Sequence, residues 1–319
     1  MRSAVIGAGN IGTLHAQILS ECGYLAAVCD IDESKLLPYG GLALYTDYKK
    51  LIDEFRPDVV HICTPHYLHA EMTVYALDRG VSVLCEKPLC ISYEELEAVL
   101  DAEKRSAAAL GVCLQNRYNR ETVFVKEYLK GRNVVSAVGH VAWHRTAEYY
   151  ASGPWRGRKA TEGGGVLINQ ALHTLDLLQY FAGMPEKLIA STSTLTLGDC
   201  IEVEDTAALI GTKGPGITLF ATNGQNCDMP VEISIKTDDS FIKIMPGLVM
   251  INGEIMDIGK ETYRPLGKLC YGSGHGALIA DYHEKLHNKE PFAINGGEGA
   301  KSARLILAAY KSGGSEVDV

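Results

Sequence analysis

The segment Gly7-Ala8-Gly9-Asn10-Ile11-Gly12 follows directly on an apolar run, Arg2 to Ile6, and leads into a helical pattern of apolar residues. A glycine-rich turn between a strand and a helix is typical of dinucleotide-binding domains. The first glycine permits a tight turn, the second lets the backbone approach a pyrophosphate, and the third lets helix and strand pack closely. The helix N-terminus then faces the phosphates. We therefore expect residues 7–12 to bind a dinucleotide.

A second apolar run, Tyr24 to Cys29, ends on Asp30. Its separation from the glycines is roughly the ~20 residues expected of the acid that binds the ribose. A carboxylate here accepts hydrogen bonds from a 2′-hydroxyl and repels a 2′-phosphate, so the sequence predicts NAD rather than NADP. A solvated acid at the start of a turn is the alternative, and Lys35 is the nearby cation that complicates the choice.

The composition favours a two-domain protein that acts on small molecules. The chain has 319 residues, of which 46% are hydrophobic, which is enough for two cores. Its net charge of −9 and the lack of a basic cluster give no electrostatic support for a nucleic-acid or membrane partner. Nine cysteines without a CxxC pair indicate reduced thiols. Because the chain also shows neither a secretory signal pattern nor a membrane-spanning run, we expect a cytoplasmic protein.

Short apolar strands alternate with helices as far as about residue 118, which predicts a doubly wound parallel sheet. The expected strands lie at 58–63, 81–85 and 112–115, and the helices at 68–78 and 93–105. Longer alternating runs favour an antiparallel sheet, at 134–143, 188–195, 206–210, 217–221 and 231–235. Further helices are expected at 119–130, 166–181, 276–287 and 297–311. The predicted class is α/β, with an NAD-binding Rossmann domain at 1–118 and a substrate-binding α+β domain with a large open, mostly antiparallel sheet at 119–319.

The run Val81-Ser82-Val83-Leu84-Cys85-Glu86-Lys87-Pro88 delivers a lysine to the end of a predicted strand. Pro88 fixes φ and removes a backbone donor, so Lys87 lies in a stiff local frame. A lone lysine at a strand end is usually structural. Behind a dinucleotide fingerprint, however, it is a candidate catalytic residue.

A polar stripe marks the predicted helix that follows Glu162-Gly163-Gly164-Gly165. Asn169, His173 and Asp176 recur there at helical spacing. A histidine, with an unperturbed pKa near ~6.5, is suited to take a proton from a sugar hydroxyl. A hydrogen-bonded core histidine is the alternative, and Asp176 is expected to be structural, bonding the backbone or an arginine.

Two histidine patterns are similar to metal sites, and the sequence favours neither. One comprises His61, Cys63, His66 and His69, but the loop at 64–69 is better explained as a wall of the nicotinamide site. The other, at 283–287, matches HExxH, the zinc-protease pattern. Its helix ends almost at once at Asn288-Lys289-Glu290-Pro291, and a third ligand lacks convincing context. We therefore predict no metal site.

Together the motifs resemble the Gfo/Idh/MocA oxidoreductase family, which contains glucose-fructose oxidoreductase and inositol dehydrogenases. The resemblance covers nearly the whole chain, and it rests on residues 7–12, the Thr64-Pro65-x-x-x-His69 loop, Glu86-Lys87-Pro88, Asn116-Arg117-Tyr118, Trp155-Arg156, Gly163-Gly164-Gly165, and His173 with Asp176. It implies a substrate cleft between the two domains. It also implies that Lys87 hydrogen-bonds the reacting oxygen while His173 exchanges the proton.

Both lines of reasoning contribute to the expected site. The cofactor-binding residues are Gly7, Gly9, Asn10, Ile11, Gly12, Asp30, Thr64, Pro65, His66, His69, Glu86 and Lys87. The substrate-binding residues are Lys87, Asn116, Arg117, Tyr118, Trp155, Asn169, Gln170 and His173. Such polar and aromatic side chains favour a polyhydroxylated ligand. Alternatively, Arg117 stabilises a hinge, and Trp155 and Tyr149 are loop residues.

Asn169 departs from the pattern of many inositol and sugar dehydrogenases in the family, which carry aspartate at this position. An amide cannot raise the pKa of His173 by charge pairing. This weakens an inositol assignment, and the Asn-Gln-x-x-His arrangement resembles members that act on nucleotide-linked sugars or glycosides.

The expected function is that of an NAD-dependent oxidoreductase, a dehydrogenase that moves hydride between nicotinamide and a secondary hydroxyl or ketone of a sugar, cyclitol or glycoside. One alternative is a glycoside-processing enzyme that uses tightly bound NAD in a transient oxidation. Another is a non-catalytic sensor of sugar and dinucleotide. An open sheet with one uncovered face further predicts a homodimer or homotetramer.

Overall fold

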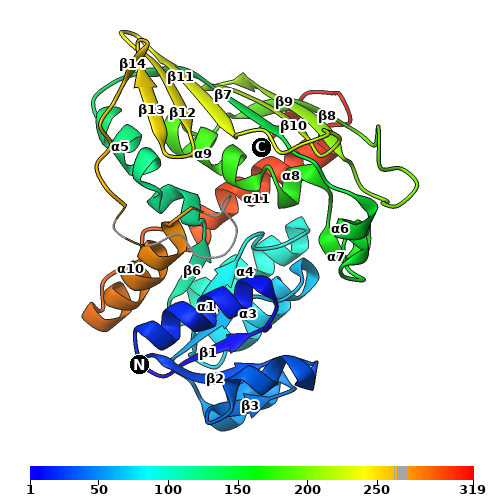
Figure 1. Ribbon diagram of the computed structural model, residues 1–319, viewed down its shortest axis with the longest axis vertical. Helices are drawn as coiled ribbons and strands as arrows, with labels where there is room; N and C mark the ends of the chain where they lie inside the picture. The colour runs from blue at the N-terminus through cyan, green and yellow to red at the C-terminus, as the bar shows by residue number, and fades with distance from the viewer. Residues whose placement is uncertain (262, 264–271) are drawn as a thin grey trace. The chain divides into compact units, whose positions relative to one another are not determined.

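The structure of the chain, a computed structural model, describes residues 1–261, 263 and 272–319. Its contacts divide it into two compact units (Figure 1). The first unit comprises Met1–Gln115 and a later segment that contains helix α10 (Gly274–Asn288) and ends at Ala300. The second comprises Asn116–Glu261 and Lys301–Val319. Among the described residues, none of the helices combines the length and the apolar character that a membrane span requires.

A parallel six-stranded sheet, in the order β3-β2-β1-β4-β5-β6, forms the centre of the first unit. Its strands are β1 (Ser3–Ile6), β2 (Leu25–Cys29), β3 (Ala43–Tyr45), β4 (Val59–Ile62), β5 (Ser82–Glu86) and β6 (Leu110–Cys113). The main helices beside them are α1 (Asn10–Glu21), α3 (His69–Leu77) and α4 (Tyr93–Arg105), with shorter turns at η1 (Glu33–Tyr39), α2 (Tyr48–Lys50), η2 (Leu51–Phe55) and η3 (His66–Leu68). Strands β1, β4 and β6 are buried along their whole length, as expected of a parallel sheet covered on both faces. The doubly wound prediction is confirmed.

Helix α10 belongs to the first unit, although the sequence analysis placed everything after residue 118 in the second domain. The hydroxyl of Tyr282, which is fully buried, donates to the carbonyl of Val83 at 2.8 Å. A Cβ at Gly111 would lie 2.7 Å from the Tyr282 ring, so glycine makes room for it. Beyond the helix, the carbonyl of Ile294 accepts a hydrogen bond from the Val112 N–H at 2.9 Å. The chain thus returns to complete the first unit through contacts that no local pattern predicts.

The second unit contains a nine-stranded sheet in the order β14-β13-β12-β11-β7-β10-β9-β8-β15. Its strands are β7 (Val134–Ala142), β8 (Lys187–Ser193), β9 (Thr206–Lys213), β10 (Gly216–Thr222), β11 (Glu232–Thr237), β12 (Phe241–Met245), β13 (Leu248–Ile251), β14 (Glu254–Ile255) and β15 (Val317–Asp318). The described strands pair antiparallel except for β7 and β10, which run parallel. The prediction of a mostly antiparallel sheet is confirmed. The sequence analysis did not predict the antiparallel strands β12, β13 and β14.

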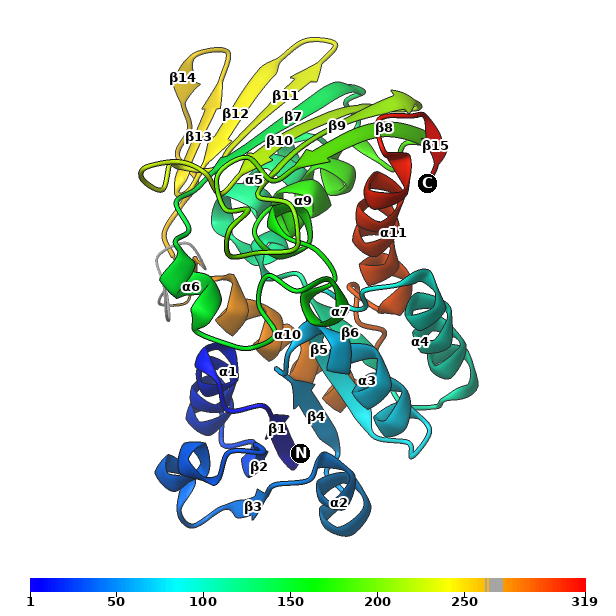
Figure 2. The same ribbon diagram turned by 90° about the vertical axis from the view of Figure 1, so that its right-hand side faces the viewer.

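Of the described helices, three pack against one face of this sheet: α5 (Arg120–Tyr128), α8 (Val166–Asn169) and α9 (Leu172–Ala182). The unit also contains η4 (Gln115–Tyr118), α6 (Ala147–Ala151), α7 (Lys159–Glu162) and α11 (Gly296–Ser312), whose first turn falls in the other unit. Figure 2 shows α5 and α9 along the same face of the sheet. A Cβ at Gly139 of β7 would lie 2.7 Å from Thr174 of α9, so the helix approaches the strand closely.

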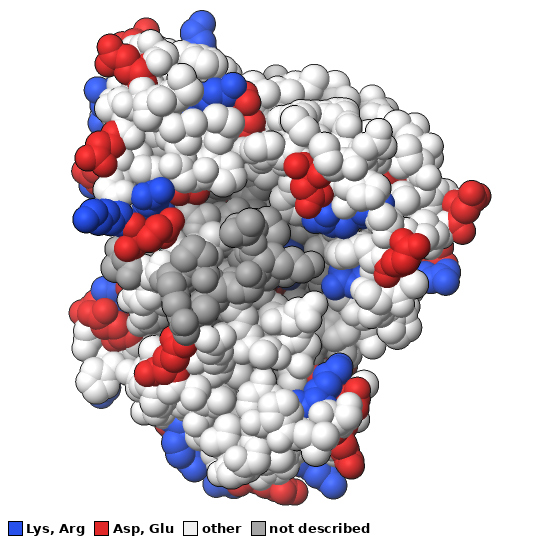
Figure 3. Space-filling view, in the orientation of Figure 1, with Lys and Arg blue, Asp and Glu red and all other residues white. Residues whose placement is uncertain are grey.

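The other face of the sheet exposes large apolar side chains. They are Val138, Ile189, Ile210, Phe220 and Phe241, which are between 37% and 53% exposed. Ile189 and Ile210 are direct cross-strand neighbours, and the rings of His140 and Phe220 stack. Elsewhere, basic and acidic side chains are interspersed over the face drawn in Figure 3.

The prediction of a single helix at 166–181 is wrong in one respect, because the structure has two helices there, α8 and α9. The N–H groups of both Gln170 and Ala171 point to the carbonyl of Val166, at 3.1 and 2.8 Å, which interrupts the regular α-helical ladder. Asn169 therefore ends α8, and His173 lies in the first turn of α9.

Candidate active site

The expected cofactor residues of the first unit follow the carboxyl ends of its parallel strands. Gly7 follows β1, Asp30 follows β2, and Lys87 follows β5. Ligands of doubly wound sheets bind at this edge, where the strand order reverses. At Gly7 the φ angle is +94°, and an added Cβ would lie 2.6 Å from the carbonyl oxygen of Cys63, after β4. The turn therefore requires glycine.

Gly9 and Gly12 serve different purposes in this turn. A Cβ at Gly12 would lie 1.7 Å from the Gly7 carbonyl oxygen, so α1 can start here only without a side chain. The Cβ position of Gly9, in contrast, has no described atom within 4 Å. Gly9 is the N-cap residue of α1, and no side chain caps the helix. Open space beside uncapped backbone N–H groups fits the pyrophosphate of a dinucleotide.

Asp30 is oriented by its neighbours. Its Oδ2 accepts a hydrogen bond from the Ala8 N–H at 2.7 Å, and its Oδ1 accepts one from the Asp32 N–H at 2.9 Å. Lys35 Nζ lies 3.5 Å from Oδ1. A carboxylate has about four acceptor positions, so these contacts leave capacity for a ribose hydroxyl.

His69 joins two loops. Its Nδ1 lies 2.7 Å from the carbonyl oxygen of Pro88, and its Nε2 lies 2.8 Å from that of Thr64. Burial lowers the pKa of His69, and the two carbonyl groups oppose that shift. Both ring nitrogens are thus turned to the backbone, and His69 links the loop at 64–69 to Pro88. His66 beside it is also buried.

Lys87 follows directly on Glu86, whose buried carboxylate contacts the lysine backbone. Its backbone N–H donates to Glu86 Oε2 at 3.1 Å, and its peptide bond to Pro88 is cis. Burial alone would raise the pKa of Glu86, but the hydrogen bond with His15 and the nearby His275 outweigh it and hold that pKa well below its usual range. Glu86, expected among the cofactor ligands, thus turns one carboxylate oxygen to buried histidines. Lys87 itself is half-buried at the carboxyl end of β5.

A polar cluster in the second unit gathers around the Tyr149 hydroxyl. That oxygen accepts hydrogen bonds from Arg156 Nη1 at 2.7 Å, Gln170 Nε2 at 3.2 Å and Asn169 Nδ2 at 3.4 Å. Asn169 Nδ2 also lies 2.5 Å from Oε1 of Glu162, whose side chain is buried. The asparagine that replaces an aspartate thus contacts a carboxylate supplied by another residue.

The triglycine before α8 is shaped by close packing. A Cβ at Gly164 would lie 1.9 Å from the Tyr310 hydroxyl, and one at Gly165 would lie 1.8 Å from the Glu204 carbonyl oxygen. Glu204 also caps α8, because its side chain accepts hydrogen bonds from the N–H groups of Gly165 and Leu167. This contact fixes the start of the segment that carries Asn169.

Arg117 and Asp176 form a buried, bidentate ion pair. Arg117 Nε and Nη2 donate to the two carboxylate oxygens at 2.8 and 2.7 Å, and the side chains are 4% and 1% exposed. Gln179 and Ser302 donate to the same carboxylate. The structural role expected of Asp176 is confirmed. The guanidinium of Arg117, a predicted substrate ligand, lies on this buried carboxylate within the second unit.

The remaining predicted substrate residues, Asn116, Tyr118, Trp155 and His173, are half-buried. Asn116 Oδ1 lies 3.5 Å from the Asn119 amide nitrogen. The guanidinium of Arg156 lies 4.5 Å from the ring centre of Trp155. Tyr118, Trp155 and His173 remain predicted ligands.

The sequence analysis missed His15, His275 and Glu162. His15 lies on the buried face of α1, where a polar residue among apolar ones was an available signal. Glu162 directly precedes the triglycine but matches no motif of its own. The position of His275 depends on α10 returning to the first unit, which sequence spacing cannot show.

Comparisons with known proteins agree with the two-unit architecture. A family model described as oxidoreductase family, NAD-binding Rossmann fold, matches residues 1–114, and the GFO/IDH/MocA C-terminal domain matches residues 133–239. Myo-inositol 2-dehydrogenase of Thermotoga maritima is 23% identical, over 98% of this chain and 96% of that protein. D-glucoside 3-dehydrogenase of Escherichia coli is 29% identical over 58% of this chain, and the match spans 55% of that protein's length.

Two solved structures share the fold over the whole chain. The WlbA dehydrogenase from Bordetella pertussis, in complex with NADH and UDP-GlcNAcA, has a TM-score of 0.85 and 25% identity, covering 100% of this chain and 98% of that one. Levoglucosan dehydrogenase, in complex with NADH and levoglucosan, has a TM-score of 0.86 at 20% identity and covers 100% and 99%.

The ion pair in the second unit generates a prediction about stability. Asp176→Asn removes the negative charge beside the buried Arg117, and this is expected to lower the free energy of unfolding by about 3–5 kcal/mol. Urea unfolding followed by circular dichroism measures the change. The control is Asp101→Asn, which removes an exposed partner of Lys104 and is expected to cost at most about 1 kcal/mol. Wild-type stability of the Asp176 variant would contradict the prediction.

Proposed function

The chain belongs to the Gfo/Idh/MocA oxidoreductase family and its cofactor is NAD, and from this premise we propose that it is a dehydrogenase for a secondary hydroxyl of a sugar, cyclitol or glycoside. The observation that carries the proposal is Lys87, anchored by a buried carboxylate at the same sheet edge as the glycine turn and Asp30. Bound NAD supplies the hydride acceptor. The protein supplies binding, orientation and the movement of a proton.

Lys87 acts on the reacting oxygen. As hydride leaves the carbon, negative charge develops on the hydroxyl oxygen, and an ammonium group stabilises that charge. The backbone of Lys87 is held by Glu86 on one side and by Pro88, which bonds His69, on the other. A held backbone limits the positions that the ammonium can adopt, which favours catalysis because little reorganisation is needed.

His173 takes the hydroxyl proton. It lies in the first turn of α9, and Arg117 and Asp176 hold this helix from within the second unit. Because Asn169 is uncharged, the residue four positions earlier does not raise the basicity of the imidazole by charge pairing. A positioned imidazole suits the removal of a hydroxyl proton during alcohol oxidation.

The polar cluster supports a polyhydroxylated substrate. Tyr149, Asn169 and Gln170 are already linked to one another by hydrogen bonds, and their remaining donors and acceptors suit sugar hydroxyls. Asn116, Tyr118 and Trp155 complete the proposed substrate residues. Among the similar proteins are D-glucoside 3-dehydrogenase, the WlbA dehydrogenase in complex with UDP-GlcNAcA and myo-inositol 2-dehydrogenase. The uncharged Asn169 is our reason for proposing a glycoside or nucleotide-linked sugar rather than inositol.

Two other functions use the same residues. A glycoside-processing enzyme oxidises its substrate transiently with tightly held NAD and shows no net redox change. A sensor binds sugar and dinucleotide without turnover. The dehydrogenase is favoured over the sensor because ligand binding alone needs neither Lys87 nor His173.

A cytoplasmic location is part of the proposal. The eight cysteines among the described residues are all free, as expected of a reducing compartment.

The proposed activity is tested by NADH absorbance with purified protein, NAD and a panel of free sugars, inositols, nucleotide sugars and glycosides. One class is expected to support NADH formation. Lys87→Ala should lower kcat/KM by about 10²–10³-fold and His173→Ala by about 10²–10⁴-fold, while NAD affinity changes little. Lys104→Ala, an exposed lysine of α4, is the control.

Each outcome of that panel separates the candidate functions. Wild-type kcat in either variant would contradict the role given to that residue. Conversion of a glycoside without net NADH would identify the transient oxidation, and ligand binding without any turnover would identify the sensor.

Asp30 determines the preference for NAD in this proposal. Asp30→Ser is expected to lower the ratio of kcat/KM with NAD to that with NADP at least ~10-fold, because it removes the carboxylate that binds the 2′-hydroxyl and repels a 2′-phosphate, and it frees Lys35 for that phosphate. The ratio is insensitive to any loss of folded protein. Asp32→Ser, two residues further on, is the control. An unchanged ratio in the Asp30 variant would rule out the ribose-binding role.

The open face of the nine-stranded sheet is proposed to pair with a second copy of the chain in a homodimer or homotetramer. Its exposed residues, including Val138 and Ile210, form an apolar surface of the kind that self-association buries. Light scattering after gel filtration is expected to show an oligomer, and Val138→Asp to weaken it. Ile31→Asp, on the 90%-exposed Ile31 of the first unit, is the control. A monodisperse wild-type monomer at micromolar concentration would contradict the proposal.

A further inference from the structure

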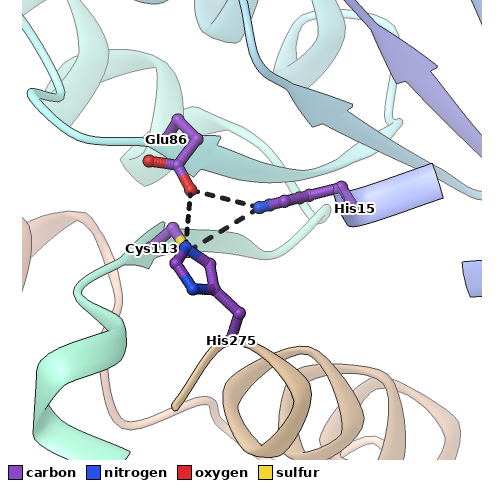
Figure 4. Close-up of side chains that lie close together, drawn as sticks. All are labelled: His15, Glu86, Cys113 and His275. Carbon is purple, nitrogen blue, oxygen red and sulfur yellow. Dashed lines mark hydrogen bonds and ion pairs between the residues drawn. The ribbon is translucent and has the colours of Figure 1, made fainter. Parts of the chain in front are cut away.

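Four side chains with metal-binding atoms converge inside the first unit. They are His15, Glu86, Cys113 and His275, and Figure 4 shows their polar ends pointing toward one another. All four are buried, and their donor atoms lie within 4.8 Å of one another. They come from four separate elements: α1, the last residue of β5, the last residue of β6, and the first turn of α10.

We propose that these four side chains bind a zinc ion. In a tetrahedral zinc site, bonds of about 2.0–2.3 Å place neighbouring ligand atoms roughly 3.3–3.7 Å apart. Here His15 Nε2 lies 3.1 Å from Glu86 Oε1 and 4.0 Å from Cys113 Sγ, and His275 Nε2 lies 3.7 Å from the same glutamate oxygen. Small side-chain rotations convert this arrangement into a coordination sphere.

The donor set selects the metal. Imidazole and thiolate ligands favour zinc over magnesium and calcium, which prefer oxygen ligands throughout. Binding replaces the proton on the Cys113 thiol by the metal and releases that proton to solvent. The resulting unit of Zn²⁺, one thiolate, one carboxylate and two neutral imidazoles carries no net charge. Neutrality matters because an uncompensated charge is costly in the buried interior.

Two further histidines form a chain of contacts on the side of the His15 ring that faces away from the proposed metal. Its Nδ1 lies 2.9 Å from His61 Nδ1, and His61 Nε2 lies 3.0 Å from His283 Nε2. A neutral imidazole donates one hydrogen bond and accepts one. With Nε2 of His15 on the metal, its Nδ1–H donates to His61, and His61 then donates to His283. Such outer contacts orient metal-bound histidines.

Four protein ligands leave zinc no open position, so the proposed site is structural rather than catalytic. It ties α1, β5, β6 and α10 together next to Lys87. The HExxH pattern contributes only indirectly, because His283 belongs to the supporting chain while His287 is exposed. The inference does not depend on the proposed dehydrogenase activity, since its readouts are metal content, spectrum and thermal stability.

The test uses the full chain carrying Cys22→Ser and Cys227→Ser, so that these two exposed thiols cannot contribute to the metal content. The protein is stripped of metal, incubated with zinc chloride, passed through a desalting column and analysed by inductively coupled plasma mass spectrometry. One zinc per chain and a higher Tm with zinc are expected. Cobalt(II) in place of zinc is expected to show the intense visible bands of a tetrahedral site and a thiolate-to-cobalt charge-transfer band.

Cys113→Ser identifies the ligand. In the same background it is expected to weaken zinc binding at least ~10-fold and to abolish the charge-transfer band. Cys90→Ser changes a thiol that is also buried, just beyond β5, and is expected to leave both unchanged.

Two results would overturn the proposal. One is a background protein that retains well under one zinc, gains no thermal stability and shows no charge-transfer band with cobalt; the cluster would then be a metal-free hydrogen-bond network in which His15 donates to Glu86. The other is Cys113→Ser with undiminished zinc affinity. If this variant fails to fold, the zinc content and cobalt spectrum of the background protein decide alone.

Discussion

The position of Lys87 in the first unit depends on the contacts of the buried Glu86 carboxylate. Its Oε1 lies beside His15 and His275, and its Oε2 accepts the backbone N–H of Lys87. A buried charge is tolerated only when it is compensated by such partners. The position of Lys87 is therefore determined by residues from distant parts of the chain, and the lysine can be held firmly although it follows directly on the end of a strand.

The second unit uses buried carboxylates in the same way. Glu204 accepts hydrogen bonds from the backbone at the start of α8 and from the Tyr310 hydroxyl, which positions the helix that ends with Asn169. Asp176 lies in α9, the helix that also carries His173, and its side chain binds Arg117 of η4. Burial raises the pKa of Glu204, whose backbone hydrogen bonds oppose the shift. Each of the two helices that carry proposed substrate residues thus contacts a buried carboxylate, Glu204 at the start of α8 and Asp176 within α9.

The sequence predicted those features that depend on local patterns. The helix α4 begins at Tyr93 and ends at Arg105 as expected, because its apolar face is regular and Ser92 caps its first turn. The glycine turn was also predicted, since steric limits at Gly7 and Gly12 act between close neighbours. The return of α10, the interruption of the helix at 166–181, the carboxylate beside Asn169 and the cluster around Glu86 were not predicted. The return of α10 and the cluster around Glu86 arise from contacts between residues far apart in the chain. The helix interruption and the contact between Glu162 and Asn169 are local, but no sequence pattern marks them.

The two units alternate along the chain, and this order affects how the protein folds during translation. When residues up to Gln115 have left the ribosome, α10 and the segment that follows it have not been synthesised. During that interval the N–H of Val112 lacks the Ile294 carbonyl, and β6 remains an open edge of the sheet. Exposed strand edges promote pairing with other chains. The nascent first unit therefore lacks α10 and the contact of Val112 with Ile294 until Asn116–Glu261 of the second unit have been translated.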